Sequence, residues 1–413
     1  MQSSRFIKIC LMVAGLSAGL YLSELFLLLT SSYFRLHCLP LRCDTRSIAA
    51  VVYDERRAGN KSYPAVHPRH LMMDENLEVL HRALLPLGGI SNVSTILCNE
   101  RGSPVRYRSG RYGFRNSEQV DIEAKGIVLL GDSFTQGFCV DDVHHFSTAI
   151  REKGYSPWNF GSSGNGPLAE YASFREYAVS LEPKYIFWFF YEGNDFEDFD
   201  RELHHPLLRQ YLTDRNFNQD LRNKQEWIDR ILTEYVDERL REYQASFLAQ
   251  RLPTRRDARR SLYEWSRLYN LRVRLGLANK GKKWQLERPL SQETLSDLTF
   301  SLLQILKDVN TSATTWGGKL IFVYLPAWQR YSDGQIDRHH PQYQSLRKGV
   351  QELGVPLLDM AQIFAAQEDP LALFPARMNL HYNEDGYHLI NNELRLFLAD
   401  GDKPHALSLT PTL

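Results

Sequence analysis

The sequence has no excess of charge of either sign. Its 413 residues contain 49 Lys and Arg against 49 Asp and Glu, a formal net charge of +0, so no overall field draws the molecule to nucleic acid. It also lacks zinc-finger cysteine spacing, a phosphate-binding P-loop and an internal repeat at solenoid periods. These absences exclude the corresponding classes and leave a globular protein, for which 43% hydrophobic and 24% charged residues are ordinary.

Cysteines are few, at five in the whole chain. Cys10 lies in an apolar run, which leaves four outside it: Cys38, Cys43, Cys98 and Cys139. An even number permits disulfides in an oxidising compartment, but buried free thiols fit the same sequence equally well. The pairing is therefore left open.

The N-terminus contains a long hydrophobic run. Residues 9–29 are almost wholly apolar, with Glu24 as their only charged residue, and a helix of about 20 such residues can cross a membrane. Arg5 and Lys8 precede the run, as in an export signal, and no convincing cleavage site follows it. We expect residues 1–34 to be an uncleaved signal-anchor with one transmembrane helix, which puts the body on the periplasmic or extracytoplasmic side. The alternatives are a cleaved signal peptide and a buried core helix.

The remainder divides into a loop-rich lead-in, residues 35–120, and a main domain, residues 121–405. The lead-in has many turn signals and is expected to pack on the main domain through short strands. The main domain alternates short apolar runs with helical stretches, a pattern typical of parallel strands buried on both faces. The predicted class is α/β, a three-layer α/β/α fold with a parallel sheet. The strand-like runs are residues 126–131, 158–161, 185–191, 319–325 and 355–358.

A charged, helical segment at about residues 200–285 interrupts this alternation. Within it, residues 251–283 contain eleven Lys and Arg against two acidic residues, Asp257 and Glu264. This basic segment could bind an anionic surface or polymer. A solvated insertion kept soluble by its charges is the simpler interpretation.

The first chemical motif follows the strand-like run at residues 126–131. Ser133 stands in a Gly-Asp-Ser sequence at the carboxyl end of that strand, where open α/β sheets bind their ligands. The following residues can open a helix whose N-terminal amides favour developing negative charge. Position 135 is Thr, so this is not the G-x-S-x-G elbow of the α/β-hydrolases. Alone, Ser133 could equally be a helix cap.

A second motif, Asp385-Gly386-Tyr387-His388, lies near the C-terminus. A serine hydroxyl needs a base, and that base needs a third group to orient it. His388 can act as the base and Asp385 can orient it, although an N-cap aspartate followed by a helix-face histidine has the same sequence.

Two further loops could supply hydrogen-bond donors. A Gly- and Ser-rich stretch over residues 159–166 contains Gly164, and Asn194 follows the apolar run 185–191. With the Ser133 amide, Gly164 and Asn194 would form an oxyanion hole, in which each donor contributes on the order of 3 kcal/mol. Gly161 is an alternative to Gly164.

In combination these motifs resemble the SGNH, or GDSL-type, hydrolase family. The matching blocks are Gly131-Asp132-Ser133, the glycine block around Gly164, Gly193-Asn194-Asp195 and Asp385-x-x-His388, within residues 125–400. The resemblance implies a serine hydrolase that needs neither metal nor cofactor. Its site would be catalytic Ser133, Asp385 and His388, with an oxyanion hole of Ser133, Gly164 and Asn194.

The expected activity is hydrolysis of O-acyl esters, acetyl above all, on an envelope or exported glycan or another ester substrate. Transfer of the acyl group to an exported polysaccharide uses the same acyl-enzyme and is the first alternative. A non-catalytic binding protein that keeps the fold is the second.

Overall fold

The computed structural model describes residues 2–30, 44, 46–74, 83–99, 102–116, 126–249, 265–268, 271–272, 290–332 and 342–399. The chain forms two compact units. The first unit contains residues 1–45, 100–103 and 238–289, and the second contains residues 46–99, 104–237 and 290–413. Each unit is described by itself.

The first unit contains the long helix α1 (Gln2–Thr30). Glu24 is fully buried, and its carboxylate accepts a hydrogen bond from the Leu271 backbone N–H at 2.7 Å. Among the described residues, none of the helices combines the length and the apolar character that crossing a membrane requires. The expected transmembrane helix is therefore not supported by this structure, and the basic segment 251–283 lies almost wholly outside the described residues.

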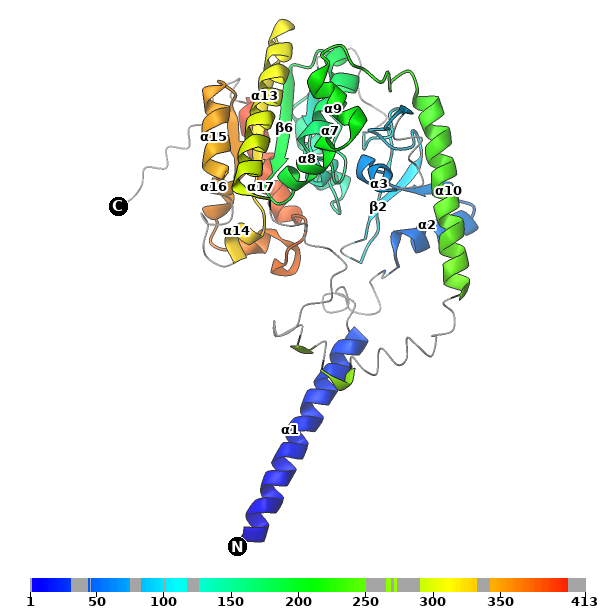
Figure 1. Ribbon diagram of the computed structural model, residues 1–413, viewed down its shortest axis with the longest axis vertical. Coiled ribbons are helices and arrows are strands. Elements are labelled where there is room, and N and C mark those ends of the chain that lie inside the picture. Colours follow the sequence, from blue (N-terminus) through cyan, green and yellow to red (C-terminus); the bar gives the residue numbers. More distant parts are fainter. Residues whose placement is uncertain are drawn as a thin grey trace, which may run out of the picture. The chain divides into compact units, whose positions relative to one another are not determined.

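The second unit is built around a five-stranded parallel sheet (Figure 1). The strand order is β5-β4-β6-β7-β8. The strands are β4 (Ile127–Leu130), β5 (Pro157–Asn159), β6 (Tyr185–Tyr191), β7 (Lys319–Leu325) and β8 (Leu357–Asp359). β4, β6 and β7 overlap their predicted runs closely, whereas β5 and β8 each share two residues with theirs.

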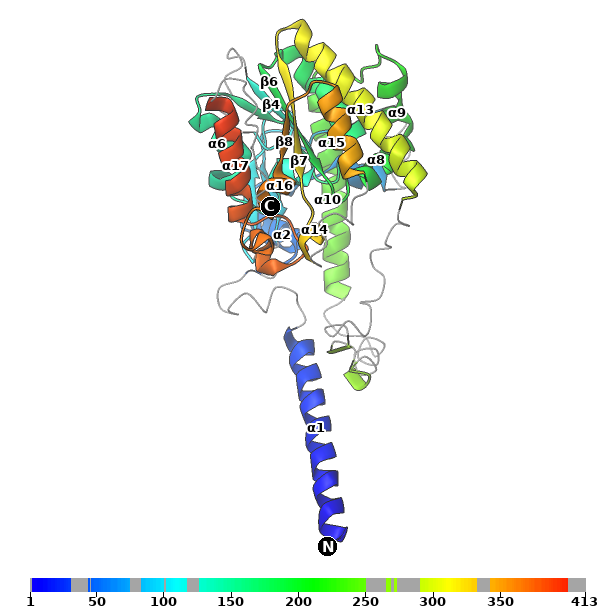
Figure 2. The ribbon, with the colours of Figure 1, turned by 90° about the vertical axis from the view of Figure 1, so that its left-hand side faces the viewer.

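Helices cover both faces of this sheet, which confirms the predicted three-layer α/β/α class. Figure 2 shows α6 (Phe146–Glu152) and α17 (Glu384–Ala399) together on one side of the strands, with α13 (Gln292–Thr315) and α15 (Tyr343–Glu352) on the other. The central strand β6 is buried at all seven positions because its two sets of alternating side chains meet different helical layers. Phe189 stacks on Phe146 of α6, and Phe190 contacts Phe196 on the opposite face.

The remaining helices of the main domain follow the strands. They are α5 (Ser133–Gln136), α7 (Pro167–Ser173), the π-helical and 3-10 turns η3 (Phe174–Ala178) and η4 (Val179–Leu181), α14 (Gln329–Ser332) and α16 (Met360–Ala365). The predicted insertion is helical where it is described, with α8 (Asp195–Leu203), α9 (Pro206–Thr213) and α10 (Gln225–Ala249). Short 3-10 turns are η2 (Asp142–His144), η5 (Pro370–Leu373) and η6 (Pro375–Arg377).

The lead-in forms a second, small sheet, as expected from its short strands. Its order is β1-β2-β3, with β1 parallel and β3 antiparallel to β2. The elements are α2 (Ile48–Arg57), β1 (Ser62–Pro64), α3 (Pro68–Met72), β2 (Ser94–Cys98) and β3 (Val105–Arg108). This sheet belongs to the same unit as the main sheet, so lead-in side chains can reach the loops around Ser133.

Candidate active site

Ser133 is held in a tight turn between β4 and α5. Gly131 has φ of 155°, and a Cβ there would lie 2.1 Å from the Thr135 hydroxyl oxygen, so the turn requires glycine. Asp132 caps α5 by accepting a hydrogen bond from the Phe134 N–H at 2.9 Å. The serine therefore stands at the carboxyl edge of the sheet, as predicted.

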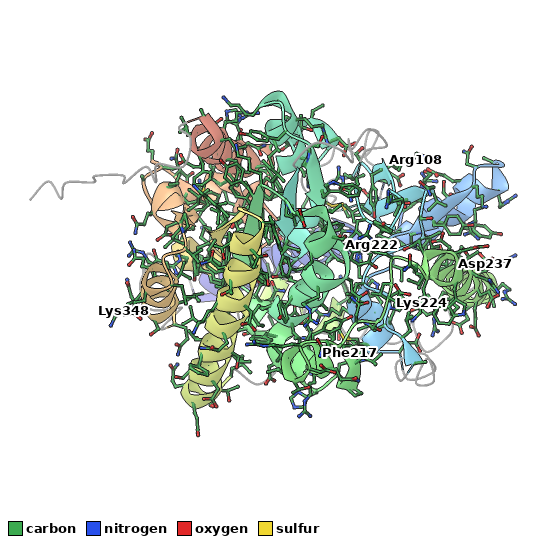
Figure 3. The ribbon with its side chains drawn as sticks, turned by 90° about the horizontal axis from the view of Figure 1, so that it is seen from above. Arg108, Phe217, Arg222, Lys224, Asp237 and Lys348 are labelled. Atoms are coloured by element: carbon green, nitrogen blue, oxygen red, sulfur yellow. A yellow bond between two sulfur atoms is a disulfide. The ribbon has the colours of Figure 1, made fainter. Side chains whose placement is uncertain are left out.

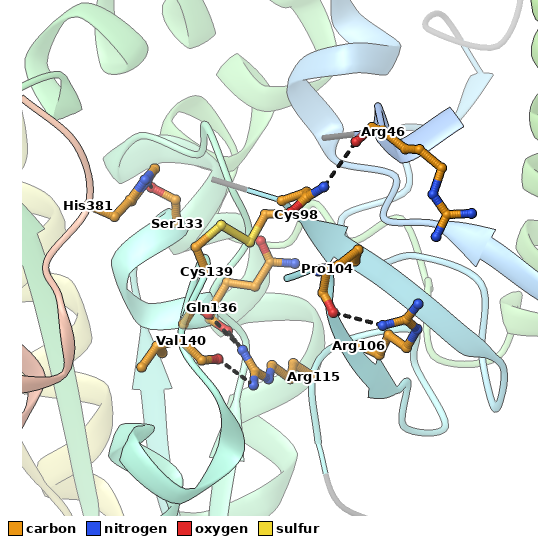
Figure 4. The surroundings of a disulfide bond; sticks show 12 residues. Arg46, Cys98, Pro104, Arg106, Arg115, Ser133, Gln136, Cys139, Val140 and His381 are labelled. Atoms are coloured by element: carbon orange, nitrogen blue, oxygen red, sulfur yellow. Dashed lines mark hydrogen bonds between the residues drawn. A yellow bond between two sulfur atoms is a disulfide. The ribbon is translucent and has the colours of Figure 1, made fainter. Parts of the chain in front are cut away.

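A histidine side chain contacts the Ser133 hydroxyl, but it is His381. Its Nε2 lies 2.9 Å from Ser133 Oγ, and Figure 4 shows the two side chains reaching each other from separate segments. The imidazole packs against the rings of Phe134 and Phe138, with centroids 4.8 and 4.5 Å away. With the proton on Nδ1, Nε2 accepts the serine proton, which is the geometry of a nucleophile and its general base.

The structure does not bring the predicted base His388 to Ser133. Both His388 and Asp385 are exposed on α17, whose inward positions include Tyr387, Ile390 and Leu394. The histidine in contact with Ser133 is thus His381, whereas Asp385 and His388 are both exposed. The helical spacing of the apolar residues could have shown this, because it directs position 388 away from the sheet.

Asp132 is the carboxylate in contact with the nucleophile. Its second oxygen lies 3.1 Å from Ser133 Oγ and is an alternative acceptor for the one hydroxyl hydrogen; Asp132 also interacts electrostatically with His381. Burial raises the pKa of Asp132 to about 6, against the opposing effects of the Phe134 N–H and His381. The residue three positions before His381 is Met378, so the family's Asp-x-x-His block does not surround this histidine.

Of the two candidate glycines for the oxyanion hole, the structure favours Gly164. The N–H of Gly161 already donates a hydrogen bond to Asn159 Oδ1 at 2.8 Å. A Cβ on Gly161 would lie 2.5 Å from the Gln136 nitrogen. Gly164 has φ of 77°, and the stem of Arg69 lies over it, 2.5 Å from where a Cβ would stand. Gly164 is thus fixed as glycine by both its backbone and its neighbour.

The Asn194 amide is oriented by a buried carboxylate. Asn194 Nδ2 donates to Asp198, whose side chain is 1% exposed. Asp198 in turn forms ion pairs with Arg69, at 3.3 Å, and with Arg201. A side-chain amide has two donor hydrogens, so this contact leaves one for another acceptor.

Glu192, the residue before the Gly193-Asn194-Asp195 block, has a structural role. Its buried carboxylate accepts hydrogen bonds from Arg330 Nε and the Ala327 N–H, both at 2.8 Å, and from the hydroxyl of Tyr324. Because Tyr324 lies on β7 and Ala327 follows it, Glu192 joins the carboxyl ends of β6 and β7. Breaking a buried pair of this kind leaves an uncompensated charge, which is strongly destabilising.

The lead-in contributes side chains that the sequence did not identify. His67 Nδ1 lies 3.2 Å from the Ser162 hydroxyl in the glycine block, and the His70 ring lies 5.2 Å from that of His67. Burial lowers the pKa of His67 to about 3, so it is neutral at physiological pH. The only available signal was the cluster His67-Pro68-Arg69-His70, which gives no spacing that links it to Ser133.

A disulfide between Cys98 and Cys139 ties the lead-in sheet to the segment after α5 (Figure 4). Arg115 reinforces the same segment by donating to the carbonyl oxygens of Gly137, at 2.6 Å, and Val140, at 2.9 Å. Cys98 and Cys139 therefore form a disulfide and are not the buried free thiols that the sequence also allowed. Cys38 and Cys43 lie outside the described residues.

In the part of the chain that the structure describes, no three His, Cys, Asp or Glu side chains are grouped so that they could hold a metal ion.

Comparisons with known proteins give structural likenesses only. No family model and no curated protein matches the chain. A lipase/acylhydrolase from Enterococcus faecalis is 14% identical, with a TM-score of 0.36, over 68% of this chain and 98% of that one. The acetylxylan esterase Axe2 from Geobacillus stearothermophilus is 11% identical, with a TM-score of 0.34, over 68% and 95%.

A member of the lipolytic G-D-S-L family from Veillonella parvula is 12% identical, with a TM-score of 0.33, over 66% of this chain and 97% of that one. At these identities and TM-scores, the description of the fold rests on this chain's own strands and helices.

The contact between His381 and Ser133 predicts that replacing His381 and replacing His388 have different effects on kcat. His381→Ala should lower kcat for an activated ester by at least about a hundredfold, since the general base is lost. His388→Ala is the matched control and should change kcat by less than about twofold, because its side chain is exposed on α17. Steady-state kinetics on both purified variants measures this, and the reverse pattern would restore His388 as the base.

The disulfide makes a prediction about stability. Cys98 and Cys139 are 41 residues apart, and closing a loop of that length stabilises a fold by about 4 kcal/mol in the chain-entropy model. Replacing both by serine should lower the free energy of unfolding by about 2–4 kcal/mol. Urea denaturation of the oxidised parent and the double variant tests this, and equal midpoints would show that the bond does not form in solution.

Proposed function

We propose that this protein is a serine esterase that removes O-acyl groups, with Ser133 as nucleophile and His381 as general base. The observation that carries the proposal is the 2.9 Å contact between Ser133 Oγ and His381 Nε2 at the carboxyl edge of the sheet. A scaffold protein has no physical need for a buried serine in contact with an imidazole nitrogen. Ester hydrolysis uses both groups directly.

The reaction would proceed through an acyl-enzyme. His381 Nε2 takes the Ser133 proton as Oγ bonds to the ester carbonyl carbon, and the carbonyl oxygen becomes an oxyanion. The tetrahedral intermediate collapses, the C–O bond to the alcohol breaks, and His381 returns the proton to the leaving oxygen. Water then loses a proton to His381 as its oxygen attacks the acyl carbon. The bond from that carbon to Oγ breaks, His381 returns the proton to Oγ, and the carboxylic acid leaves with Ser133 regenerated.

The proposed oxyanion hole is the N–H groups of Ser133 and Gly164 with the side-chain amide of Asn194. Three observations support it: the Gly161 N–H is already used, Gly164 is fixed as glycine, and Asp198 leaves one Asn194 hydrogen available. Preorganised donors of this kind are usually the largest single contribution to acyl-transfer catalysis.

The proposed substrate is an acyl ester, acetyl above all, of an envelope or exported glycan. An enzyme held at a membrane meets large and local substrates more readily than dilute small ones. Transfer to a sugar hydroxyl needs only that the hydroxyl replace water in the second half of the reaction, so the same site would serve an O-acetyltransferase.

We also propose that residues 1–34 attach the enzyme to a membrane, with the catalytic body on the extracytoplasmic side. Large apolar side chains of α1 are exposed to solvent, among them Leu11 at 67%, Met12 at 76% and Leu16 at 73%. The disulfide supports an oxidising compartment, because such bonds are rare where thiols are kept reduced.

Activity is tested with p-nitrophenyl acetate and a fluorophosphonate probe. The parent should release nitrophenol and become labelled, and Ser133→Ala should do neither while its Tm stays within about 2 °C, since one hydroxyl oxygen is removed from a packed turn. Acetate released from acetylated xylan supports the esterase, and acetyl groups recovered on an added oligosaccharide favour transfer. A folded parent that is neither labelled nor active would support the scaffold alternative.

Membrane attachment is tested separately by fractionation of cells that express the full chain. The protein should sediment with membranes and remain there after carbonate extraction, whereas a chain that begins at residue 46 should be released. Protease added to intact spheroplasts should degrade the body of the full chain. Recovery of the full chain in the soluble fraction would refute the attachment.

A further inference from the structure

A cavity whose lining does not include Ser133 lies in the same compact unit. Its volume is about 790 Å³, and three arginines line it: Arg111, Arg175 and Arg222. Two carboxylates, Glu176 and Asp220, also contribute to the lining. Cationic groups therefore outnumber anionic ones in this cavity.

Two of these guanidinium groups converge on one neutral oxygen. Arg111 Nη2 and Arg222 Nε both donate to the hydroxyl oxygen of Tyr112, the second at 3.1 Å. Arg222 also donates to the hydroxyl of Ser180. The two guanidinium charges repel each other, and the Tyr112 ring offsets part of that repulsion, with its centroid 4.6 Å from Arg111 and 5.8 Å from Arg222. A bound anion would offset more of it. Within the described part of the chain, the other N–H groups of both side chains make no hydrogen bond, so they can bind such an anion in the fork geometry of guanidinium.

The third arginine is structural. Arg175 Nη1 donates to the carbonyl oxygen of Tyr211, and its Nη2 donates to those of Arg215 and Phe217. It adds positive charge to the cavity while it holds the segment after α9 in place. Arg175 is therefore left intact in the test below.

The acidic side chains of the cavity are committed to other donors. Glu176 accepts hydrogen bonds from the Tyr211 hydroxyl and from the N–H groups of Gln219 and Leu221. Asp220 accepts from Asn223 Nδ2 at 2.7 Å. Among the described residues, no ion pair within 4.0 Å involves Arg111, Arg175 or Arg222.

The cavity lies near the amino ends of the strands, at the opposite end from Ser133. α7 begins just after the glycine block at the carboxyl end of β5, and η4 ends at Leu181, shortly before β6 begins at Tyr185. Ser180 therefore lies near the amino end of β6, whereas Ser133 follows the carboxyl end of β4. Arg222 belongs to the segment between α9 and α10, which also contains Phe217 and Lys224 (Figure 3).

We propose that this cavity, centred on Arg111 and Arg222, binds the oxyanion group of a ligand, either a sugar carboxylate or a phosphate. The ligand's oxygens accept hydrogen bonds from the remaining guanidinium N–H groups, and its negative charge offsets the two positive charges that meet at the Tyr112 hydroxyl. The site is independent of the chemistry at Ser133, so its test does not use esterase activity.

The test is isothermal titration of the purified full-length chain with trigalacturonate, inorganic phosphate and neutral xylotriose. At least one anionic probe should bind saturably, and xylotriose should not bind. Binding of trigalacturonate alone assigns a carboxylated sugar, and binding of phosphate alone assigns a phosphate group. Arg111→Gln and Arg222→Gln should each weaken the bound anion about tenfold or more, because each removes charge-assisted hydrogen bonds.

Arg209→Gln is the matched control. Arg209 is an exposed arginine on α9 that takes part in none of the ion pairs of the described chain, so its loss should change the affinity by less than about twofold. Arg222→Lys keeps the charge and separates loss of the fork from loss of folding, with Tm measured for every variant. Absence of anion binding, or equal losses in the Arg209 and Arg222 variants, would overturn the proposal.

Discussion

The burial of β6 and β7 on both faces is the constraint on which the rest of the structure depends. Strands covered on each side by helices cannot present polar side chains along their length without a large desolvation cost. Polar groups are therefore confined to the strand ends. The Glu192–Arg330 pair links the carboxyl ends of these two strands. Asn194 precedes α8 and donates to Asp198 within that helix, which lies against Gly166 of the glycine block.

The lead-in completes this edge of the sheet. Arg69 crosses over Gly164 to Asp198, His67 reaches Ser162, and the Cys98–Cys139 bond ties the small sheet to the segment after α5. Each contact fixes a loop that would otherwise be free to move at the end of a strand. Preorganisation of donors depends on such supports, because a loop that moves by 1 Å loses much of its effect on a transition state.

Much of the main domain could be read from the sequence, since its strands are short apolar runs with turns after them. The Gly131-Asp132-Ser133 turn was equally readable, because a strand, a glycine and a helix cap occur in sequence order. The predicted base His388 does not contact Ser133, for a physical reason. Asp385 and His388 have the spacing of the family motif, but the apolar face of α17 turns them outward, and His381 lies in the irregular segment before the helix.

Other parts had no local signal. His67 contacts Ser162, 95 positions away, and Arg69 contacts Asp198, 129 positions away. Both contacts depend on how the lead-in folds back onto the main domain. The same is true of the arginine cavity, whose members come from positions 111, 175 and 222. A sequence pattern reports neighbours along a helix or strand, and these residues are neighbours only after the chain has folded.

The helical stretch from Pro167 to Leu181 relates the two sites. At roughly 1.5 Å per residue it spans about 20 Å, from the glycine block beside Ser133 to Ser180 in the arginine cavity. A small ester could not reach both ends, whereas one polymer chain with acyl groups and acid groups could. Binding at the cavity would then raise the local concentration of ester groups near Ser133 without any change in the catalytic residues, which is how a second contact increases the efficiency of an enzyme on a polymer.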